Sequence, residues 1–422
     1  MREMKDSGVE WIGEIPVDWE LSKIGSVYDE RNEKVSDKDF APLSVTKQGI
    51  VPQLETAAKT DNGDNRKLIR KDDFVINSRS DRRGSCGISE YEGSCSLINT
   101  VLKPQTNMCN RYYGFVFKSD SFADEYYRWG HGIVDDLWST KWIDMKSIYI
   151  PAPDIAEQER IADYLDVKCS KIDEIIEKQQ AIIEKLREYK LSIITEIVTK
   201  GLKHNVKMKD SGVRFVDTIP YDWENRKMIT ILSTRVVDGP HESPELYDRG
   251  IPYISATAIV NGKIDFSLMR GYISKEYCEI CDKRYSPQRG DLLVVKLGAS
   301  TGQVAIVDTD ERFNIWVPLA AVRCNDEALP KFVYYAFQSD YFVRQMELSW
   351  TFGTQQTLGV QTIEKLRILL PPIAEQRKIV KFLDTIYDYI GSKIKKVEKM
   401  IEKLEEYKKS LIYEVVTGKK EV

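Results

Sequence analysis

Two long stretches of the sequence place apolar residues in alternating steps of four and three, which is the spacing of a coiled-coil seam. In the second stretch, Ile373 to Thr417, these residues are Ile390, Ile394, Val397, Ile401, Leu404, Leu411 and Val415. The first stretch, Ile155 to Thr199, fills the matching positions with Ile172, Ile176, Gln179, Ile183, Leu186, Ile193 and Ile197. A proline-rich lead precedes each stretch, which suits a helix start. The pattern predicts two helices, each about 70 Å long at 1.5 Å per residue.

The two predicted helices are copies of each other, because Ile155 recurs as Ile373, 218 residues later. Lys190 and Lys408 interrupt the seam at equivalent positions, and Gly391 is the single glycine within either stretch. Two seams of one period in one chain pair most simply with each other. The alternative is two separate amphipathic helices, each packed on its own domain.

The segments before the helices are duplicated as well. The run from Lys5 to Glu20 returns as Lys209 to Glu224, with ten of sixteen positions identical. This offset is 204 residues, so the second copy has gained 14 residues before its helix. The chain therefore alternates globular and helical parts, and its two copies predict a pseudo-two-fold arrangement.

Within each globular part the pattern is mixed. Strands in register at the 218-residue offset are expected at Asp73 to Asn77 and Asp291 to Val295, and corresponding strands are expected to start at Pro42 and Pro252. Aromatic, helix-like segments follow at Arg111 to Trp129 and Pro330 to Leu348. We predict a mixed α/β (α+β) fold with two similar globular domains and two long helices. The expected boundaries are 1–153 and 202–372 for the domains, and 154–201 and 373–422 for the helices.

Composition narrows the class of protein. No apolar run among the 422 residues approaches membrane-spanning length and no signal-peptide pattern opens the chain, so we expect a cytoplasmic protein without a membrane partner. The seven cysteines are scattered, which indicates reduced thiols, and the isolated pair Cys278 and Cys281 does not predict a zinc site. The net charge of −4 counts against non-specific binding of nucleic acid by the chain alone. Specific reading by a few local contacts stays open, above all where a partner also holds the nucleic acid.

Motifs for catalysis are missing from the sequence. The three histidines are far apart, and the loop from Leu297 to Gly302 lacks the Gly-Lys-Ser/Thr of a phosphate-binding loop. The segment that starts at Leu370 reads Leu-Pro-Pro-Ile, without the Asn or Asp and the aromatic residue of an amino-methyltransferase motif. We therefore predict a binding protein with no catalytic residue, no metal and no cofactor. A nuclease or methyltransferase that acts alone is disfavoured.

Polar loops in both domains are the candidates for binding. Each domain carries a loop closed by an aligned glycine, Gly84 or Gly302, and a second polar loop follows the aromatic segment. Arginine can donate two hydrogen bonds to the edge of guanine, glutamine can form two with adenine, and serine, threonine or lysine can donate to phosphates. The candidate DNA-binding residues are Arg66, Lys67, Arg70, Arg79, Ser80, Arg82, Arg83, Trp138, Thr140, Lys141, Lys296, Ser300, Thr301, Gln303, Thr354, Gln355 and Gln356. For each of these residues the alternative to DNA contact is a solvated turn, in which the side chain is only a surface charge or polar group.

Taken together, these motifs resemble those of one known family, the specificity subunits of Type I restriction–modification systems. The resemblance is carried by the duplicated Asp-Ser-Gly-Val…Ile-Pro-x-Asp-Trp-Glu opening and by Ile-Ala-Glu-Gln at Ile155 and Ile373. The repeated Glu-Lys-Leu-x-Glu-Tyr-Lys and the Val-Thr-Lys-Gly and Val-Thr-Gly ends add to it. The resemblance covers essentially the whole chain, and the motifs follow one another in the order that is usual for the family.

The resemblance implies two target-recognition domains that each read one half of a split DNA site, and an antiparallel helix pair that spaces them. It also implies partners: double-stranded DNA, two methyltransferase subunits that bind S-adenosylmethionine and methylate adenine, and restriction subunits that use ATP. A coiled-coil adaptor that bridges proteins without contacting DNA is the alternative. That alternative accounts for the helices and the acidic balance but not for paired loops of divergent polar content.

Overall fold

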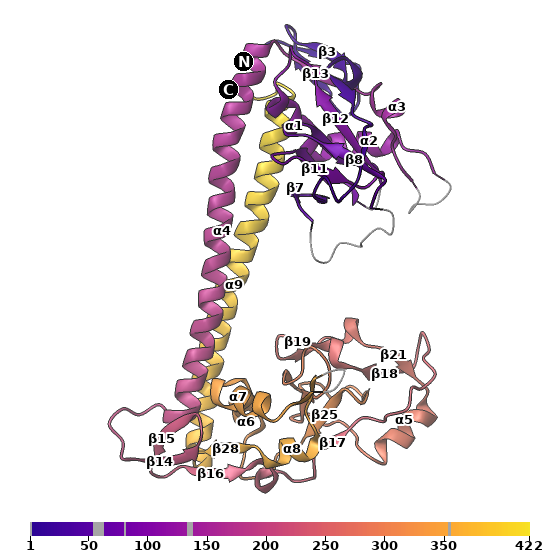
Figure 1. Ribbon diagram of the computed structural model, residues 1–422. Coiled ribbons are helices and arrows are strands. Elements are labelled where there is room, and N and C mark those ends of the chain that lie inside the picture. Colours follow the sequence, from indigo (N-terminus) through magenta and orange to yellow (C-terminus); the bar gives the residue numbers. More distant parts are fainter. Residues whose placement is uncertain (1, 54–62, 80–81, 133–137, 353–355) are drawn as a thin grey trace. The chain divides into compact units, whose positions relative to one another are not determined.

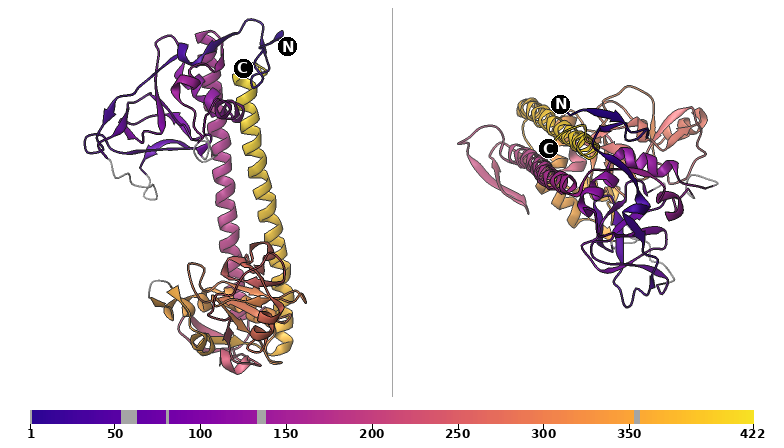
Figure 2. Two further views of the ribbon diagram at one scale, coloured as in Figure 1. Left: turned by 90° about the vertical axis from the view of Figure 1, so that its right-hand side faces the viewer. Right: turned by 90° about the horizontal axis from the view of Figure 1, so that it is seen from above.

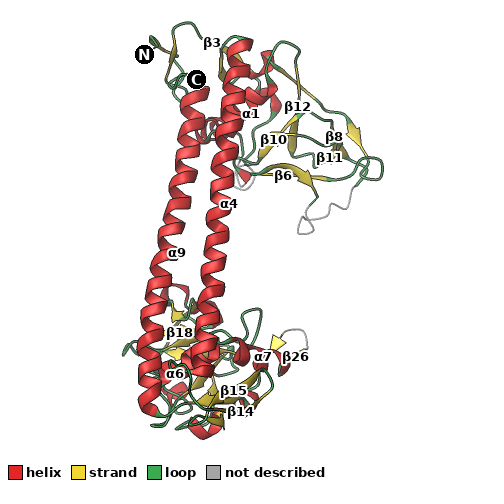
Figure 3. Cartoon of the chain, turned by 90° about the vertical axis from the view of Figure 1, so that its left-hand side faces the viewer, coloured by secondary structure: helices red, strands yellow, loops and turns green. Residues whose placement is uncertain are grey.

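The computed structural model describes residues 2–53, 63–79, 82–132, 138–352 and 356–422. The chain divides into two compact units: unit 1 comprises residues 1–180 and 398–422, and unit 2 comprises residues 181–397. Each unit therefore holds one globular domain and one segment of each long helix (Figure 1). Figure 3 distinguishes the strands of these domains from the helices.

The domain of unit 1 is built on a four-stranded antiparallel sheet in the order β10-β9-β12-β4, next to a three-stranded sheet in the order β11-β8-β5. The pairs β1–β2, β3–β13 and β6–β7 complete it. The strands are β1 Met4–Asp6, β2 Glu14–Pro16, β3 Glu20–Lys23, β4 Tyr28–Glu30, β5 Lys34–Val35, β6 Leu43–Thr46, β7 Gly49–Pro52, β8 Arg66–Ile69, β9 Phe74–Asn77, β10 Cys86–Ile88, β11 Gly93–Cys95, β12 Asn99–Pro104 and β13 Tyr149–Ala152. The helices of this domain are α1 Asn110–Lys118, α2 Asp120–Arg128 and α3 Trp142–Met145.

The domain of unit 2 repeats this plan with a four-stranded sheet in the order β17-β25-β22-β23 and a three-stranded sheet in the order β21-β18-β24. Its strands are β14 Met208–Val213, β15 Val216–Pro220, β16 Glu224–Lys227, β17 Val237–Asp238, β18 Ile251–Ile254, β19 Ile259–Val260, β20 Lys263–Ile264, β21 Gly271–Ile273, β22 Leu292–Val295, β23 Val304–Ile306, β24 Asn314–Ile315, β25 Leu319–Val322, β26 Thr351–Phe352, β27 Gln356–Thr357 and β28 Arg367–Leu370. Its helices are α5 Lys275–Asp282, α6 Pro330–Gln338, α7 Asp340–Leu348 and α8 Val360–Lys365.

The central strands agree with the sequence expectation, because β9 and β22 lie at the predicted positions and each pairs antiparallel with two neighbours. The strands expected to start near Pro42 and Pro252 are present as β6 and β18, and both make a parallel pairing, through the Pro42–Ser94 bridge to β11 in unit 1 and with β24 in unit 2. Strand β6 forms a hairpin with β7, whereas β18 pairs antiparallel with β21 and parallel with β24.

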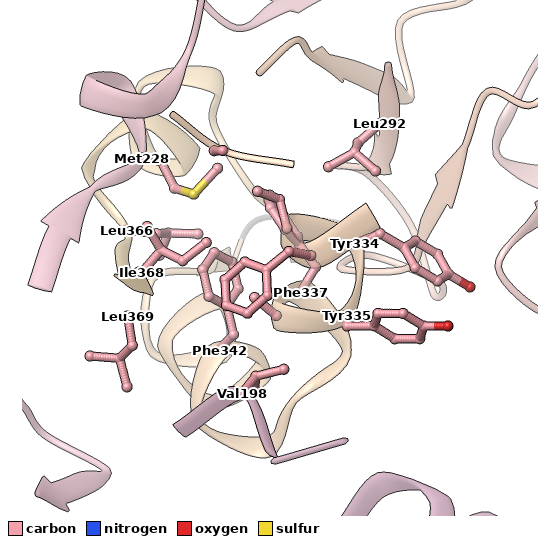
Figure 4. Close-up of a cluster of buried hydrophobic side chains, with 14 of the residues drawn as sticks. Val198, Met228, Leu292, Tyr334, Tyr335, Phe337, Phe342, Leu366, Ile368 and Leu369 are labelled. Carbon is pink, nitrogen blue, oxygen red and sulfur yellow. The ribbon is translucent and has the colours of Figure 1, made fainter. Parts of the chain in front are cut away.

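Aromatic side chains fill the core of each domain. Each predicted aromatic segment forms two helices that meet at a buried serine, Ser119 or Ser339, so neither is one helix. In unit 2, Phe337 of α6 and Phe342 of α7 lie with ring centroids 4.4 Å apart. Figure 4 shows Val198, from a long helix, pointing into the same cluster. The end of that helix is therefore part of the domain core.

The long helices are α4, Ile155–Lys200, and α9, Ile373–Val416. In unit 1 their segments run antiparallel, with the Lys408 ammonium 2.6 Å from the Asp173 carboxylate. In unit 2 the Lys190 ammonium lies 3.3 Å from the ring centroid of Tyr387. Within each unit the two segments lie side by side in all views (Figure 2). The predicted seam residues are all buried or half-buried. The predicted fold class and the antiparallel helix pairing are thus confirmed.

Among the described residues, no helix is both long enough and apolar enough to span a bilayer. The heptad seams of α4 and α9 alternate with charged positions, and their apolar residues face each other or a domain core.

The glutamine of the repeated Ile-Ala-Glu-Gln motif forms hydrogen bonds between the start of each long helix and its domain. The Gln158 amide accepts a hydrogen bond from the Cys109 backbone N–H (2.9 Å) and donates one to the Pro153 carbonyl (2.8 Å). Gln376 makes the equivalent bonds with the Leu329 N–H and the Pro371 carbonyl, at 2.8 and 2.9 Å. Cys109 and Leu329 are the N-cap residues of α1 and α6, whose first N–H groups have no partner inside the helix. Both glutamines are buried, so the motif couples helix to domain through satisfied polar groups.

Replacing Gln158 with alanine is expected to lower the free energy of unfolding of unit 1 by about 1–3 kcal/mol, because it leaves a buried N–H and a buried carbonyl without partners. Chemical denaturation followed by circular dichroism measures this loss. The neighbouring Glu159 is exposed, and Glu159→Ala should change stability by less than about 0.5 kcal/mol. Equal losses in the two variants would contradict a structural role for the glutamine.

Candidate nucleic-acid interface

In unit 1, two predicted loops that are far apart in sequence meet. The Thr140 N–H donates to the Ser78 carbonyl (3.0 Å), and Arg79 and Ser139 form an antiparallel bridge. Ser139 is also bridged to His131 through two backbone hydrogen bonds. We call the described residues of 78–84 together with 138–141 the unit 1 loop surface. It forms where strand β9 ends and α3 begins.

Unit 2 joins its two loops in the same way. The Leu358 N–H donates to the Lys296 carbonyl (2.8 Å), and the Gly298 N–H donates to the Gln356 carbonyl (3.2 Å). The Thr301 hydroxyl contacts the Gly298 carbonyl at 2.7 Å and the Gln356 carbonyl at 3.3 Å. We call residues 297–303 together with 356–357 the unit 2 loop surface. Both units therefore build one composite surface from two loops, at equivalent places in the fold.

The candidate residues differ in how far they reach solvent. Exposed side chains are Arg70, Arg79, Arg82, Arg83, Lys141 and Gln303. Half-buried side chains are Trp138, Ser300 and Gln356, and buried ones are Arg66, Lys67, Thr140, Lys296 and Thr301. Ser80, Thr354 and Gln355 lie outside the described residues. The contact of each candidate with DNA stays a prediction, and the exposed side chains are accessible to a ligand.

Two of the buried candidates, Arg66 and Lys67 on strand β8, are bonded to protein groups. The Arg66 guanidinium donates to the hydroxyl and carbonyl of Ser94, at 2.8 and 3.2 Å. The Lys67 ammonium donates to the Asn99 carbonyl at 2.9 Å and lies 3.3 Å from the Glu30 carboxylate. These bonds offset the cost of burying charge. They connect β8 to its neighbours and hold the sheet beneath the loops.

Lys296 stands at the base of the unit 2 loop surface in a compact ionic cluster. Its ammonium lies 2.9 Å from the Asp238 carboxylate, which also pairs with Arg284 and with His241. Burial by itself would raise the pKa of Asp238, but its bond to Lys296, with His241 and Arg284 nearby, holds that pKa below its ordinary value. Asp238 therefore stays ionised and fixes Lys296 where β22 enters the loop.

The part of the chain that the structure describes holds no candidate metal site, because no three histidine, cysteine or carboxylate side chains come together in a way that could hold an ion. Cys278 and Cys281 are buried, free thiols on α5. The chemistry that the loop surfaces offer is hydrogen bonding and charge pairing.

One protein family fits this chain over most of its length. The sequence profile of that family, the Type I restriction modification DNA specificity domain, matches residues 16–188 and 220–403. The chain belongs to this family. The two matched stretches fall in the two copies of the duplicated sequence, and they confirm the resemblance carried by the repeated motifs. Members of the Type I specificity family are recognition components without catalysis, so this chain is a sequence-specific DNA-recognition subunit.

Relatives in the Type I specificity family match nearly the whole chain. The MjaVIII specificity subunit of Methanocaldococcus jannaschii is 23% identical over 423 residues, covering 96% of this chain and 93% of the relative. The EcoKI specificity subunit of Escherichia coli strain K12 is 21% identical over 361 residues, covering 83% and 75%. A chain from a solved structure on complex assembly of the type I R-M system has a TM-score of 0.68 at 14% identity, covering 95% and 98%. At that identity the likeness shows the shared fold.

Sequence reasoning missed several residues that shape the loop surfaces of this specificity subunit. Asp124 of α2 forms an ion pair with Arg83, and Asp238 holds Lys296. Behind the unit 2 loop surface lies a hollow that no motif indicated, with Tyr387 of α9 in its wall. One signal was available: at the 218-residue offset, Asp173 aligns with Gly391, so the two copies differ there in charge.

Proposed function

We propose that this chain recognises a two-part DNA site, with one half read by the loop surface of unit 1, in domain 1–153, and the other by that of unit 2, in domain 202–372. One observation carries the proposal. Both units join two loops into a polar surface at equivalent positions, but they fill those surfaces with different side chains. A duplicated frame with divergent donors suits two readers of two different sequences.

The exposed side chains fit direct reading of base edges. Arg79, Arg82 and Arg83 in unit 1 offer guanidinium groups that match the paired acceptors of guanine. In unit 2, the exposed Gln303 and the half-buried Gln356 offer amides that match adenine. Lys141 and Arg70 suit phosphate contacts, which set the register on the duplex. The chemistry therefore favours different preferred bases for the two units.

The net charge of −4 indicates that a partner helps to hold the DNA. We propose that two methyltransferase subunits dock on this chain, bind S-adenosylmethionine and methylate adenine, and that restriction subunits join them and use ATP. Two equivalent apolar rows support a pair of identical partners. Ile182 and Tyr189 are exposed on the unit 2 segment of α4, and Met400 and Tyr407 occupy the matching places on the unit 1 segment of α9. The proposed place of action is the cytoplasm.

The helix pair supplies a physical basis for spacing two half-sites. Two readers on one face of a duplex need centres about 34 Å apart, close to one helical turn. A coiled coil with a continuous seam is stiffer than a flexible linker. We propose that α4 and α9 set the length of the unread spacer between the half-sites.

A mobility-shift assay with the methyltransferase partner present tests the proposal. Arg79→Ala and Arg83→Ala should each weaken binding to the specific duplex by about 5- to 150-fold, the effect of losing one bidentate base contact of about 1–3 kcal/mol. Arg111 is also exposed but lies on α1, outside the unit 1 loop surface, where it pairs with Asp163 and Asp166 of α4. Arg111→Ala is therefore the matched control and should bind normally. Absence of any DNA complex would favour the protein-bridging adaptor.

A further inference from the structure

The two units differ in the space behind their loop surfaces. In unit 1 the hollow between the loop and helices α1 and α2 measures about 20 Å³. In unit 2 the corresponding hollow, between the loop and helices α6 and α7, extends to Asn261, Gly262 and the two long helices, and measures about 440 Å³. The second value lies in the range of sites that hold small molecules, about 300–1,000 Å³.

Two helix positions that line the hollows differ in the size and kind of side chain. Helices α2 and α7 start at equivalent residues, so Tyr126 and Tyr127 of α2 correspond to Met346 and Glu347 of α7. In unit 1 the Tyr126 hydroxyl donates to the Thr140 carbonyl (3.0 Å), and the Tyr127 ring lies 5.8 Å from that of Trp138. These tyrosines occupy the space and contact the second loop. Methionine and glutamate at the same positions leave the unit 2 hollow open.

A second difference places a cation in the wall of this hollow. The seam lysine of unit 1, Lys408, pairs with the Asp173 carboxylate. For the seam lysine of unit 2, Lys190, the position equivalent to that aspartate is Gly391, at the 218-residue offset. No ion pair of Lys190 is present among the described residues; its ammonium lies 3.3 Å from the Tyr387 ring centroid and lines the hollow. The Tyr387 hydroxyl donates to the Asn261 carbonyl (3.1 Å), which fixes the ring.

The remaining lining is aromatic and polar. Phe337 and Trp350 contribute rings, and the Trp350 indole N–H is shielded from solvent without a hydrogen-bond partner in the described structure. Such an orphan donor is costly unless a ligand supplies an acceptor. Gln303 of the loop surface and Glu347 line the hollow and are exposed, so it is continuous with the proposed DNA-reading face.

We propose that the unit 2 hollow binds a single unstacked nucleotide, with its phosphate paired to the Lys190 ammonium and its base against the Trp350 indole. A nucleotide combines an anionic group, a flat face and both donors and acceptors, which matches one ammonium, aromatic rings, amides and one carboxylate. The nucleotide comes either from the bound duplex, turned out of its stack, or from free solution. The duplex source rests on the proposed function, and the free source does not.

The experiment has two arms that distinguish these sources. In the first arm, isothermal titration calorimetry measures binding of dAMP, dCMP, dGMP and TMP to the full chain, with deoxyadenosine as the probe that lacks phosphate. In the second arm, the complex with the methyltransferase partner binds duplexes that carry 2-aminopurine at successive positions of the second half-site. A rise in fluorescence reports an unstacked base.

Three variants make the test specific. Gly391→Asp gives Lys190 the carboxylate that Lys408 has, and an added Cβ there meets no atom within 4 Å. We expect it to weaken nucleotide binding at least tenfold while leaving deoxyadenosine binding unchanged. Glu347→Tyr introduces the unit 1 side chain and should abolish the signal in whichever arm shows one. Gly391→Ala is the matched control, since it removes the helix glycine without adding charge, and it should bind like the parent chain.

The outcomes separate this inference from the proposed function. A signal in at least one arm that Gly391→Asp or Glu347→Tyr removes, and Gly391→Ala retains, supports the site. Silence in both arms, or equal signals in all variants, overturns it. A mobility shift of the unmodified duplex with the same preparation tests the proposed function alone, so a chain that binds DNA but gives neither signal refutes only the nucleotide site.

Discussion

Exchange of residues 1–153 for the corresponding region of a relative is expected to change one half of the recognised DNA site and to leave the other half unaltered. The unit 1 loop surface lies within this region, and the unit 2 loop surface consists of residues 297–303 and 356–357. A half-site of several base pairs, at about 1–3 kcal/mol for each mismatch, corresponds to a switch of preference on the order of 10³-fold or more.

Methylation profiling of cells that carry the exchanged chain and its partner measures the result directly, because the methylated motif contains both half-sites. The reciprocal exchange of residues 202–372 is the matched experiment and should alter only the other half. The donor region must keep the contacts that Gln158 and the end of α9 make with the domain, including the bond from the Tyr112 hydroxyl to the Val416 carbonyl (2.9 Å). Changes in both half-sites after a single exchange would refute independent reading.

Lengthening both helices by one heptad is expected to lengthen the spacer of the DNA site while both half-sites stay the same. Seven residues inserted between Gln180 and Ala181, and seven between Val397 and Glu398, preserve the seam on each side. They add about 10.5 Å at 1.5 Å per residue, which corresponds to at most about 3 base pairs at 3.4 Å each. The new spacer length is read from the methylated motif.

Insertion into one helix alone is the control for this prediction. An insertion of seven residues in α4 without its counterpart in α9 leaves the two helices of unequal length and forces one of them to bulge. We expect that variant to lose specific binding without acquiring a new spacer. If the doubly lengthened chain methylates sites with the original spacer, the helices do not set the distance.

The sequence was informative where structure follows from local periodicity. The α4 and α9 seams repeat within a single helix, so their apolar spacing revealed both helices and their pairing. The duplicated motifs showed two similar domains, and the aligned strands β9 and β22 followed from short apolar runs. The Ile-Ala-Glu-Gln repeat was visible as a motif, but the sequence did not show that its glutamine forms hydrogen bonds between the long helix and the domain. Its glutamine bonds depend on Cys109 and Leu329, which are about 50 residues away.

The candidate site was predicted as a set of loops and not as a surface. Ser78 and Thr140 are bonded although many residues separate them, and nothing in either loop's own sequence specifies the other. Charge alone made Arg66 and Lys67 look equivalent to Arg79 and Arg83, because a sequence does not show which side of a sheet is covered. In the structure the first two are buried against Ser94, Asn99 and Glu30, whereas the second two are exposed.

By itself the sequence determined the duplication, the paired helices, the family and the absence of known catalytic motifs, since each depends on residues close together or on repeats at a fixed offset. Tertiary structure alone decided which polar residues share a surface, which charges are buried, and that unit 2 keeps a hollow where unit 1 is filled. Those features arise from packing between distant segments. Where such segments meet, a methionine in place of a tyrosine, or a glycine in place of an aspartate, changes the space or the charge around residues that are distant in the sequence.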